Sequence, residues 1–218
     1  VVTNALDPGE TNTVRINLRT TNNFGQDVYT NRAYGRAQGL AEPIQSEDVY
    51  AVTPRYSAGN IVFSDLNNDG NLDAGEHGIA GVHVFLYSVG VDGNIGGGDD
   101  VNAATAITDL NGRYVLETYE PGNYYVEIST IDFQSGGVLD GYSVQGDGAA
   151  NANNDEDENL DHNLIFNSGY YRTGIFNLGE NQEPIYEIGE TSLIDENSNM
   201  TIDLAVIPPV FDIGNRVW

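Results

Sequence analysis

The chain has 218 residues with a formal net charge of −25, 33 acidic residues against eight basic ones, and no cysteine. This length suits one or two domains with sizeable cores, and the absence of cysteine excludes disulfides. Strong negative charge argues against binding to nucleic acid or to an anionic membrane, and no apolar run reaches the roughly 18 residues of a membrane span. Divalent cations are therefore the expected counter-charge.

Apolar residues alternate with a period of two through most of the chain, and no window of a dozen residues holds a helical period. Such alternation predicts strands, and its clearest examples lie at 14–18, 82–86, 124–128 and 200–206. Turn-forming sequences separate the strands at 7–10, 109–113, 120–123 and 178–181. The spacing predicts an all-β protein built from antiparallel sandwiches.

The segment 64–76, SDLNNDGNLDAGE, has the spacing of a calcium loop although its flanks look like strands. Short oxygen donors, Asp65, Asn67 and Asp69, stand at loop positions 1, 3 and 5, and Gly70 at position 6 permits a sharp turn. The other expected ligands are the backbone carbonyl of Asn71 and the carboxylates of Asp73 and Glu76. An Asn/Asp/Gly turn is the alternative, but a turn does not require Glu at position 12. The sequence thus predicts a structural Ca²⁺ site between two strands.

Two further loops are rich in oxygen donors. In the glycine-rich loop 91–102, the candidate ligands of a second site are Asp92, Asn94, Asp99 and Asp100. In the segment 145–163, which has no spacing template, the candidates for a third site are Asp147, Asp155, Asp157 and Asp161. The alternative for the loop 91–102 is a flexible acidic hairpin tip. Asp109 and Asn111 are expected to cap a turn and not to bind an ion.

One short repeat suggests how the chain is organised. AGNIVF at 58–63 returns as IGNRVW at 213–218, so a second unit is expected to begin near the C-terminal end of this sequence. The predicted division is part of one domain at 1–57, a complete repeat at 58–209 and the first strand of the next repeat at 210–218.

The sequences GNIVFSDLNNDGNLDAGEHGIAGVHVFLY and TDLNGRYVLETYEPGNYYVEI closely resemble the B-type repeats of staphylococcal serine-aspartate-repeat surface proteins, a branch of the collagen-adhesin B-domain group. The resemblance covers residues 58–209. It implies immunoglobulin-like sandwiches in tandem, an extracellular location on a bacterial surface, and several calcium ions per repeat. Residues 1–57 are similar to the C-terminal half of a bacterial surface Ig-like domain. Some relatives carry a Lys-Asn crosslink, which this chain cannot form because it has no lysine.

No catalytic arrangement is apparent in the sequence. His77, His83 and His162 are isolated, and neither a paired-histidine zinc spacing nor a nucleophile motif is present. His83 is expected on a strand as a packed or half-exposed residue, and core or cross-strand packing is expected for Tyr124, Tyr125, Tyr170 and Tyr171. The protein is therefore predicted not to be an enzyme.

The predicted function is a calcium-stiffened spacer in a large secreted adhesin or extracellular filament. Its expected partners are neighbouring repeats of the same chain, and other subunits through strand addition at 213–218. A glycan-binding or protein-binding module that uses the long loops 130–163 is the alternative.

Overall fold

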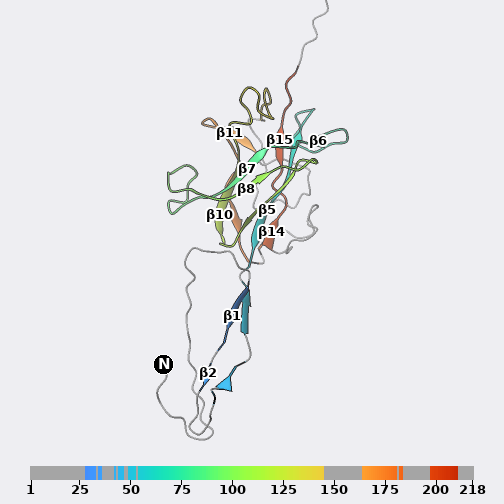
Figure 1. Ribbon diagram of the computed structural model, residues 1–218. Helices are drawn as coiled ribbons and strands as arrows, with labels where there is room; N and C mark the ends of the chain where they lie inside the picture. Colours follow the sequence, from blue (N-terminus) through green and yellow to red (C-terminus); the bar gives the residue numbers. More distant parts are fainter. Residues whose placement is uncertain are drawn as a thin grey trace, which may run out of the picture. The chain divides into compact units, whose positions relative to one another are not determined.

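The fold is taken from a computed structural model (Figure 1), which describes residues 28–32, 34–35, 42, 44–46, 49–52, 54–144, 164–180, 182–183 and 197–210. The chain divides into two compact units, Val1–Thr53 and Pro54–Trp218. Each unit is described by itself. The predicted division at 57/58 and 209/210 stays a prediction.

In the first unit, the described strands form two antiparallel pairs. Strand β1 (Val28–Asn31) pairs with β4 (Val49–Val52), and β2 (Tyr34–Gly35) pairs with β3 (Ile44–Gln45). The pairs are nested in sequence, as expected for a hairpin. The predicted strand at 14–18 and the predicted turn at 7–10 lie outside the described residues.

In the described part of the second unit, a larger sheet contains six strands. Its order is β11 (Ile165–Asn167), β12 (Tyr170–Arg172), β10 (Gly122–Ile128), β7 (His83–Ser88) and β8 (Val101–Ile107), and β13 (Phe176–Leu178) also pairs with β10. The strands of this sheet pair antiparallel.

A smaller sheet is organised around the long strand β5 (Tyr56–Ser64) (Figure 1). Strands β6 (His77–Gly78) and β9 (Arg113–Thr118) pair antiparallel with β5. Parallel pairing is made by β14 (Ser198–Asn199) and β15 (Leu204–Val206). The predicted all-β class is confirmed, and the two sheets are those of an immunoglobulin-like sandwich.

The core lies between the sheets and follows the alternation of the sequence. On β7, Val84 and Leu86 are fully buried, whereas the side chain of His83 is 47% exposed. On β10, Val126 and Ile128 are fully buried in the same cluster. Alternate residues of a strand point to opposite faces of a sheet, so the period of two buries one face of each strand.

The Gly-Asn pair of β5 has a local explanation. A methyl group on Gly59 would overlap the carbonyl oxygen of Tyr114 on β9, so glycine allows the two backbones to approach. The next residue, Asn60, accepts a hydrogen bond from the Arg113 guanidinium. The second copy of this pattern, at 213–218, lies outside the described residues.

The turn between β8 and β9 forms as predicted. Asp109 Oδ1 accepts the backbone N–H groups of Asn111 at 2.8 Å and of Arg113 at 2.9 Å. The expectation that Asp109 caps a turn is therefore confirmed. No helix in the part of the chain that the structure describes is long and apolar enough to cross a membrane.

Candidate functional site

The first predicted ion loop joins β5 to β6 and lies against the smaller sheet. Its first residue, Asp65, donates its backbone N–H to the Val206 carbonyl on β15 at 2.9 Å. Leu72, in the middle of the loop, packs on a small apolar cluster of Ile61, Phe63 and Ala205. The loop is thus attached to the sheet at its start and at its middle.

Asp65 organises the first half of this loop. Its side chain is fully buried, and its carboxylate accepts the backbone N–H groups of Asn68 at 2.6 Å and of Gly70 at 2.9 Å. The chain turns here through two residues with positive φ, Asn68 at 59° and Gly70 at 86°. Glycine and asparagine adopt this conformation more easily than other residues, so the sequence itself encodes the turn.

Glu76 connects the two ends of the loop. Its Oε1 accepts the N–H of Leu66 at 2.6 Å, and its Oε2 accepts the N–H of Asp73 at 2.9 Å. The carboxylate of Glu76, at loop position 12, therefore has a structural role that an ordinary turn would not require.

The side-chain amide of Asn67 lies between two carboxylates. Its Nδ2 donates to Asp69 Oδ2 at 2.8 Å and to Asp73 Oδ2 at 3.0 Å. Asn71 donates its backbone N–H to Asp69 Oδ1 at 2.9 Å. The six predicted ligands thus lie in one loop, where most of their side-chain oxygens accept N–H groups of the protein. Among the described residues, no three or more His, Asp or Glu side chains converge on a point that could hold a metal ion.

The second predicted loop joins β7 to β8, and its acids are also held by backbone amides. Asp99 Oδ2 accepts the N–H of Val91 at 2.7 Å, and Asp92 Oδ1 accepts the N–H of Asn94 at 2.8 Å. Asp100 Oδ2 accepts the N–H of Gly96 at 2.6 Å. This loop therefore folds back on itself, as its glycines predicted.

The two adjacent acids of this loop each keep one oxygen without a partner. Oδ1 of Asp99 and Oδ1 of Asp100 are buried and make no hydrogen bond. A methyl group on Gly97 would overlap Asp92 Oδ2 and lie 3.0 Å from Asp99 Oδ1. Glycine at this position therefore leaves room for both oxygens to lie next to it. A buried carboxylate oxygen without a partner is unfavourable, because it has lost its contact with water and gained no hydrogen bond.

The oxygen donors of both loops are of the type that a hard divalent cation prefers, although among the described residues no three acidic side chains converge on one point. Calcium takes six to eight oxygen ligands in flexible geometry, and both loops supply carboxylate and amide oxygens. The orphaned oxygens of Asp99 and Asp100 are the structural feature that fits a cation best. They belong to the second loop, although its sequence pattern is weaker than that of the first.

The third predicted site, at Asp147, Asp155 and Asp157, lies outside the described residues. Residues 145–163, which are part of the long loops that the alternative binding function would use, also lie outside the described residues. The described part of those loops is compact, since Leu139 N–H donates to the Asp132 carbonyl at 2.8 Å and Gly136 N–H donates to Asp140 Oδ2 at 2.9 Å.

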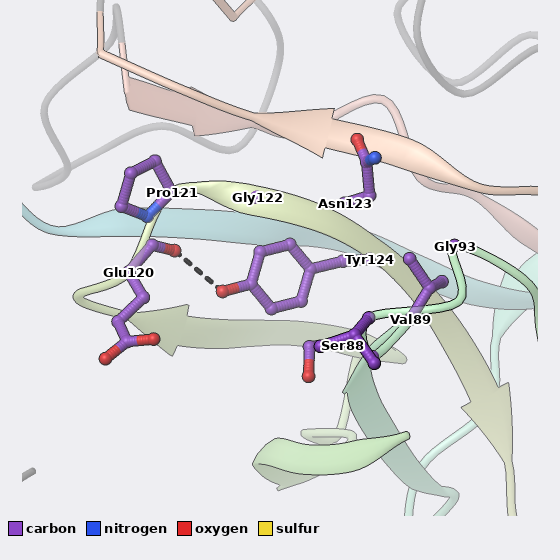
Figure 2. Close-up of a pocket in the computed structure, with 10 residues that line it drawn as sticks. Ser88, Val89, Gly93, Glu120, Pro121, Gly122, Asn123 and Tyr124 are labelled. Carbon is purple, nitrogen blue, oxygen red and sulfur yellow. Dashed lines mark hydrogen bonds between the residues drawn. The ribbon is translucent and has the colours of Figure 1, made fainter. Parts of the chain in front are cut away.

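An open cavity of about 440 Å³ lies between the segments 88–93 and 120–124 (Figure 2). Figure 2 shows the Tyr124 hydroxyl directed at the Glu120 backbone, and it donates to the Glu120 carbonyl at 2.7 Å. Three of its ten lining residues are glycines. Glu120 is the one acidic side chain among its lining residues.

The structure also places the histidine and tyrosines that were singled out. His83 lies half-exposed on β7 as expected, and its Nδ1 is 3.0 Å from Oδ1 of the buried Asp132. Tyr124 and Tyr125 are 3% and 2% exposed, so the expectation that they pack is confirmed for both. The sequence pattern predicted no functional role for Tyr125, which bonds to Asp100 of the second loop, or for Arg172, whose guanidinium lies near Gly96 of that loop.

Comparisons with known proteins agree with this architecture. Residues 56–175 match the family model of the SdrD B-like domain. This chain belongs to the SdrD B-like domain family. The predicted resemblance is confirmed, and membership of the family places the chain outside the cell, at the cell surface.

Several staphylococcal proteins are similar to this member of the family. Serine-aspartate repeat-containing protein D of Staphylococcus aureus (strain Newman) is 31% identical over 135 residues, which is 62% of this chain. Protein F of Staphylococcus epidermidis is 32% identical over 169 residues, or 78% of the chain. Protein C of Staphylococcus aureus (strain MRSA252) is 33% identical over 129 residues, or 58%. The matched regions span only 10%, 7% and 13% of these three relatives.

Proposed function

We propose that this chain is a calcium-stiffened spacer in a large secreted cell-surface adhesin or extracellular filament, and that it catalyses nothing. Family membership supports the spacer role, and the acidic loops support calcium as the stiffening ligand. Bound calcium would neutralise carboxylates that otherwise repel one another, so that two long loops become fixed parts of the sandwich.

The observation that carries the calcium part of the proposal is the pair of buried, unpartnered oxygens on Asp99 and Asp100. Two adjacent carboxylates with bare oxygens are unfavourable without a counter-charge. The chain has no lysine to supply one, and Arg172, the arginine near Gly96 of this loop, is paired with Glu127. A divalent cation from the medium has the charge and the preference for oxygen that the loop requires.

The first loop contributes through its position. Asp65 is bonded to β15, and Glu76 immediately precedes β6, so a cation held by these two residues would tie both strands to the end of β5. Since the loop joins strands and not helices, its ion would be structural and not a trigger for opening a helix pair.

Calcium and chelator should therefore give different stabilities. Extracellular calcium modules have dissociation constants of about 10⁻⁴ to 10⁻³ M. At a free calcium concentration 100 times this constant, binding at one site stabilises the folded state by about 2.7 kcal/mol. For a unit of this size the melting temperature should rise by roughly 5–10 °C per site. Calorimetric melting of the chain in chelator and in excess calcium measures the rise.

Limited proteolysis in the same two conditions locates the effect. Calcium should protect the segments 64–78 and 91–100, and magnesium at equal concentration should protect them less, because it demands a tighter octahedral shell and loses water reluctantly. Identical melting and identical cleavage in calcium and chelator would overturn the calcium part of the proposal.

The proposed partners follow from the family and from the charge. Neighbouring repeats of a longer chain come first, because the matched relatives are many times longer than this sequence. Strand addition to other subunits would involve 213–218, outside the described residues. Nucleic acid has no place in the proposal, since a net charge of −25 repels polyanions. Membrane insertion has none either, since no apolar run of the sequence reaches the roughly 18 residues of a membrane span.

A further inference from the structure

A side-chain hydrogen bond joins the second loop to strand β10 of the larger sheet. The Tyr125 hydroxyl, from β10, donates to Asp100 Oδ2 at 2.9 Å. Gly96 N–H donates to the same oxygen, and the other oxygen of the carboxylate, Oδ1, is the buried one without a partner. Tyr125 therefore helps to decide which oxygen of Asp100 stays available.

The ring of Tyr125 is itself held tightly. It is 2% exposed and stacks on Tyr87, with ring centroids 5.3 Å apart and planes 12° apart. The Arg172 guanidinium lies 5.3 Å from the Tyr125 centroid and 3.8 Å from that of Tyr170. Such stacking leaves the hydroxyl little freedom to move away from Asp100.

Arg172 is fixed in turn by an ion pair. Its Nε donates to Glu127 Oε2 at 2.5 Å, and both side chains are mostly buried. Tyr125 and Glu127 occupy the same face of β10, opposite the residues that point into the core. A planar guanidinium can stack and form this ion pair at once, which an ammonium group cannot do as well.

We infer that Tyr125 is a positioning residue for the second loop: it fixes one oxygen of Asp100 so that the other remains for a cation, and Arg172 holds the tyrosine in place. The inference rests on the proposed calcium binding. Groups that orient metal ligands from outside commonly change metal affinity by 10- to 100-fold when removed.

The test is the variant Tyr125→Phe, which keeps the ring and removes only the hydroxyl. Calcium titration of the whole chain by calorimetry should show the affinity of the second site reduced about tenfold. Tyr87→Phe is the matched control, because it removes a hydroxyl from the ring stacked on Tyr125 and should leave the affinity unchanged. Asp92→Asn, which alters a proposed ligand, identifies the signal of the second site.

A double-mutant cycle separates positioning from a general loss of stability. If Tyr125 acts through Asp100, then Tyr125→Phe should weaken calcium binding in the native background and have no further effect in an Asp100→Asn background. A merely structural tyrosine would lower the melting temperature equally in both backgrounds without changing the affinity.

The outcomes distinguish the inference from the proposal beneath it. Loss of the second-site signal in Asp92→Asn, together with tenfold weaker calcium binding in Tyr125→Phe, supports both the second ion site and the positioning role of Tyr125. If Asp92→Asn reduces the second-site signal but Tyr125→Phe binds calcium with the same affinity as Tyr87→Phe, the positioning role is overturned and the ion site is retained. A titration in which Asp92→Asn equals the native chain overturns the second site itself.

Discussion

At the scale of single residues, the first loop is organised by carboxylates that accept backbone N–H groups. Asp65 holds the turn at 68–70, and Glu76 connects Leu66 with Asp73. Bonds from amides to a carboxylate are stronger than bonds between neutral groups. The loop therefore has a defined shape of its own, and a cation would be added to an ordered set of donors.

Replacing Glu76 tests this arrangement. Glu76→Ala removes both acceptors, so the free energy of unfolding should fall by about 1–2 kcal/mol in chelator, and calcium should restore less of the stability than it gives the native chain. Urea unfolding with and without calcium measures both quantities. Glu76→Gln, which keeps one acceptor oxygen, should lie between the two. A calcium response in Glu76→Ala equal to that of the native chain would contradict its role as a ligand.

At the scale of elements, the structure depends on close approaches between strands and loops. Gly59 brings β5 against β9, and Gly78, at the end of β6, brings that strand against the turn at Asn111 and Gly112. In the second loop, Gly97 leaves room for the carboxylates of Asp92 and Asp99 to approach the backbone. Glycine at these positions is required by the space and not by a generally flexible chain.

The variant Gly97→Ala tests whether that space belongs to an ion site. The added methyl group would displace Asp92 or Asp99, so calcium affinity at the second loop should fall by tenfold or more, with little change of melting temperature in chelator. Gly174→Ala is the matched control, since a methyl group there meets nothing within 4 Å and should leave affinity unchanged. Calorimetric titration provides the measurement, and equal affinities in the two variants would argue against a site above Gly97.

At the scale of the whole molecule, five tyrosines should make the stability depend on alkaline pH. Burial is the main cause of the raised pKa of each of them, and the residues are Tyr56, Tyr114, Tyr124, Tyr125 and Tyr171. For Tyr114 the negative charge of Asp203 adds to the effect. Its hydroxyl donates to the Ile202 carbonyl at 2.6 Å, so the protonated form is also the bonded form.

The sign follows from the direction of the shifts. In the unfolded chain tyrosine ionises near pH 10, whereas the folded chain keeps these protons. The stabilisation is thus complete below about pH 10 and is lost as the pH rises from there toward the folded pKa values, by up to about 1.4 kcal/mol per pH unit for each tyrosine. Urea unfolding between about pH 9 and 11 should show this fall, with a smaller slope in Tyr114→Phe. A flat profile would contradict it.

The sequence alone determined the features that depend on residues close together in the chain. Alternation specified the strands because one face of each sheet is buried, Asn, Asp and Gly at fixed spacing specified the first acidic loop, and closely spaced glycines indicated that the second folds back on itself. Tertiary structure decided which distant residues meet: the parallel pairing of β14 and β15 with β5, Asp132 beside His83, Tyr125 bonded to Asp100 of the second loop, and Arg172 near Gly96 of that loop. These contacts depend on the register between strands, which is set by the packing of the whole sandwich and not by any short segment.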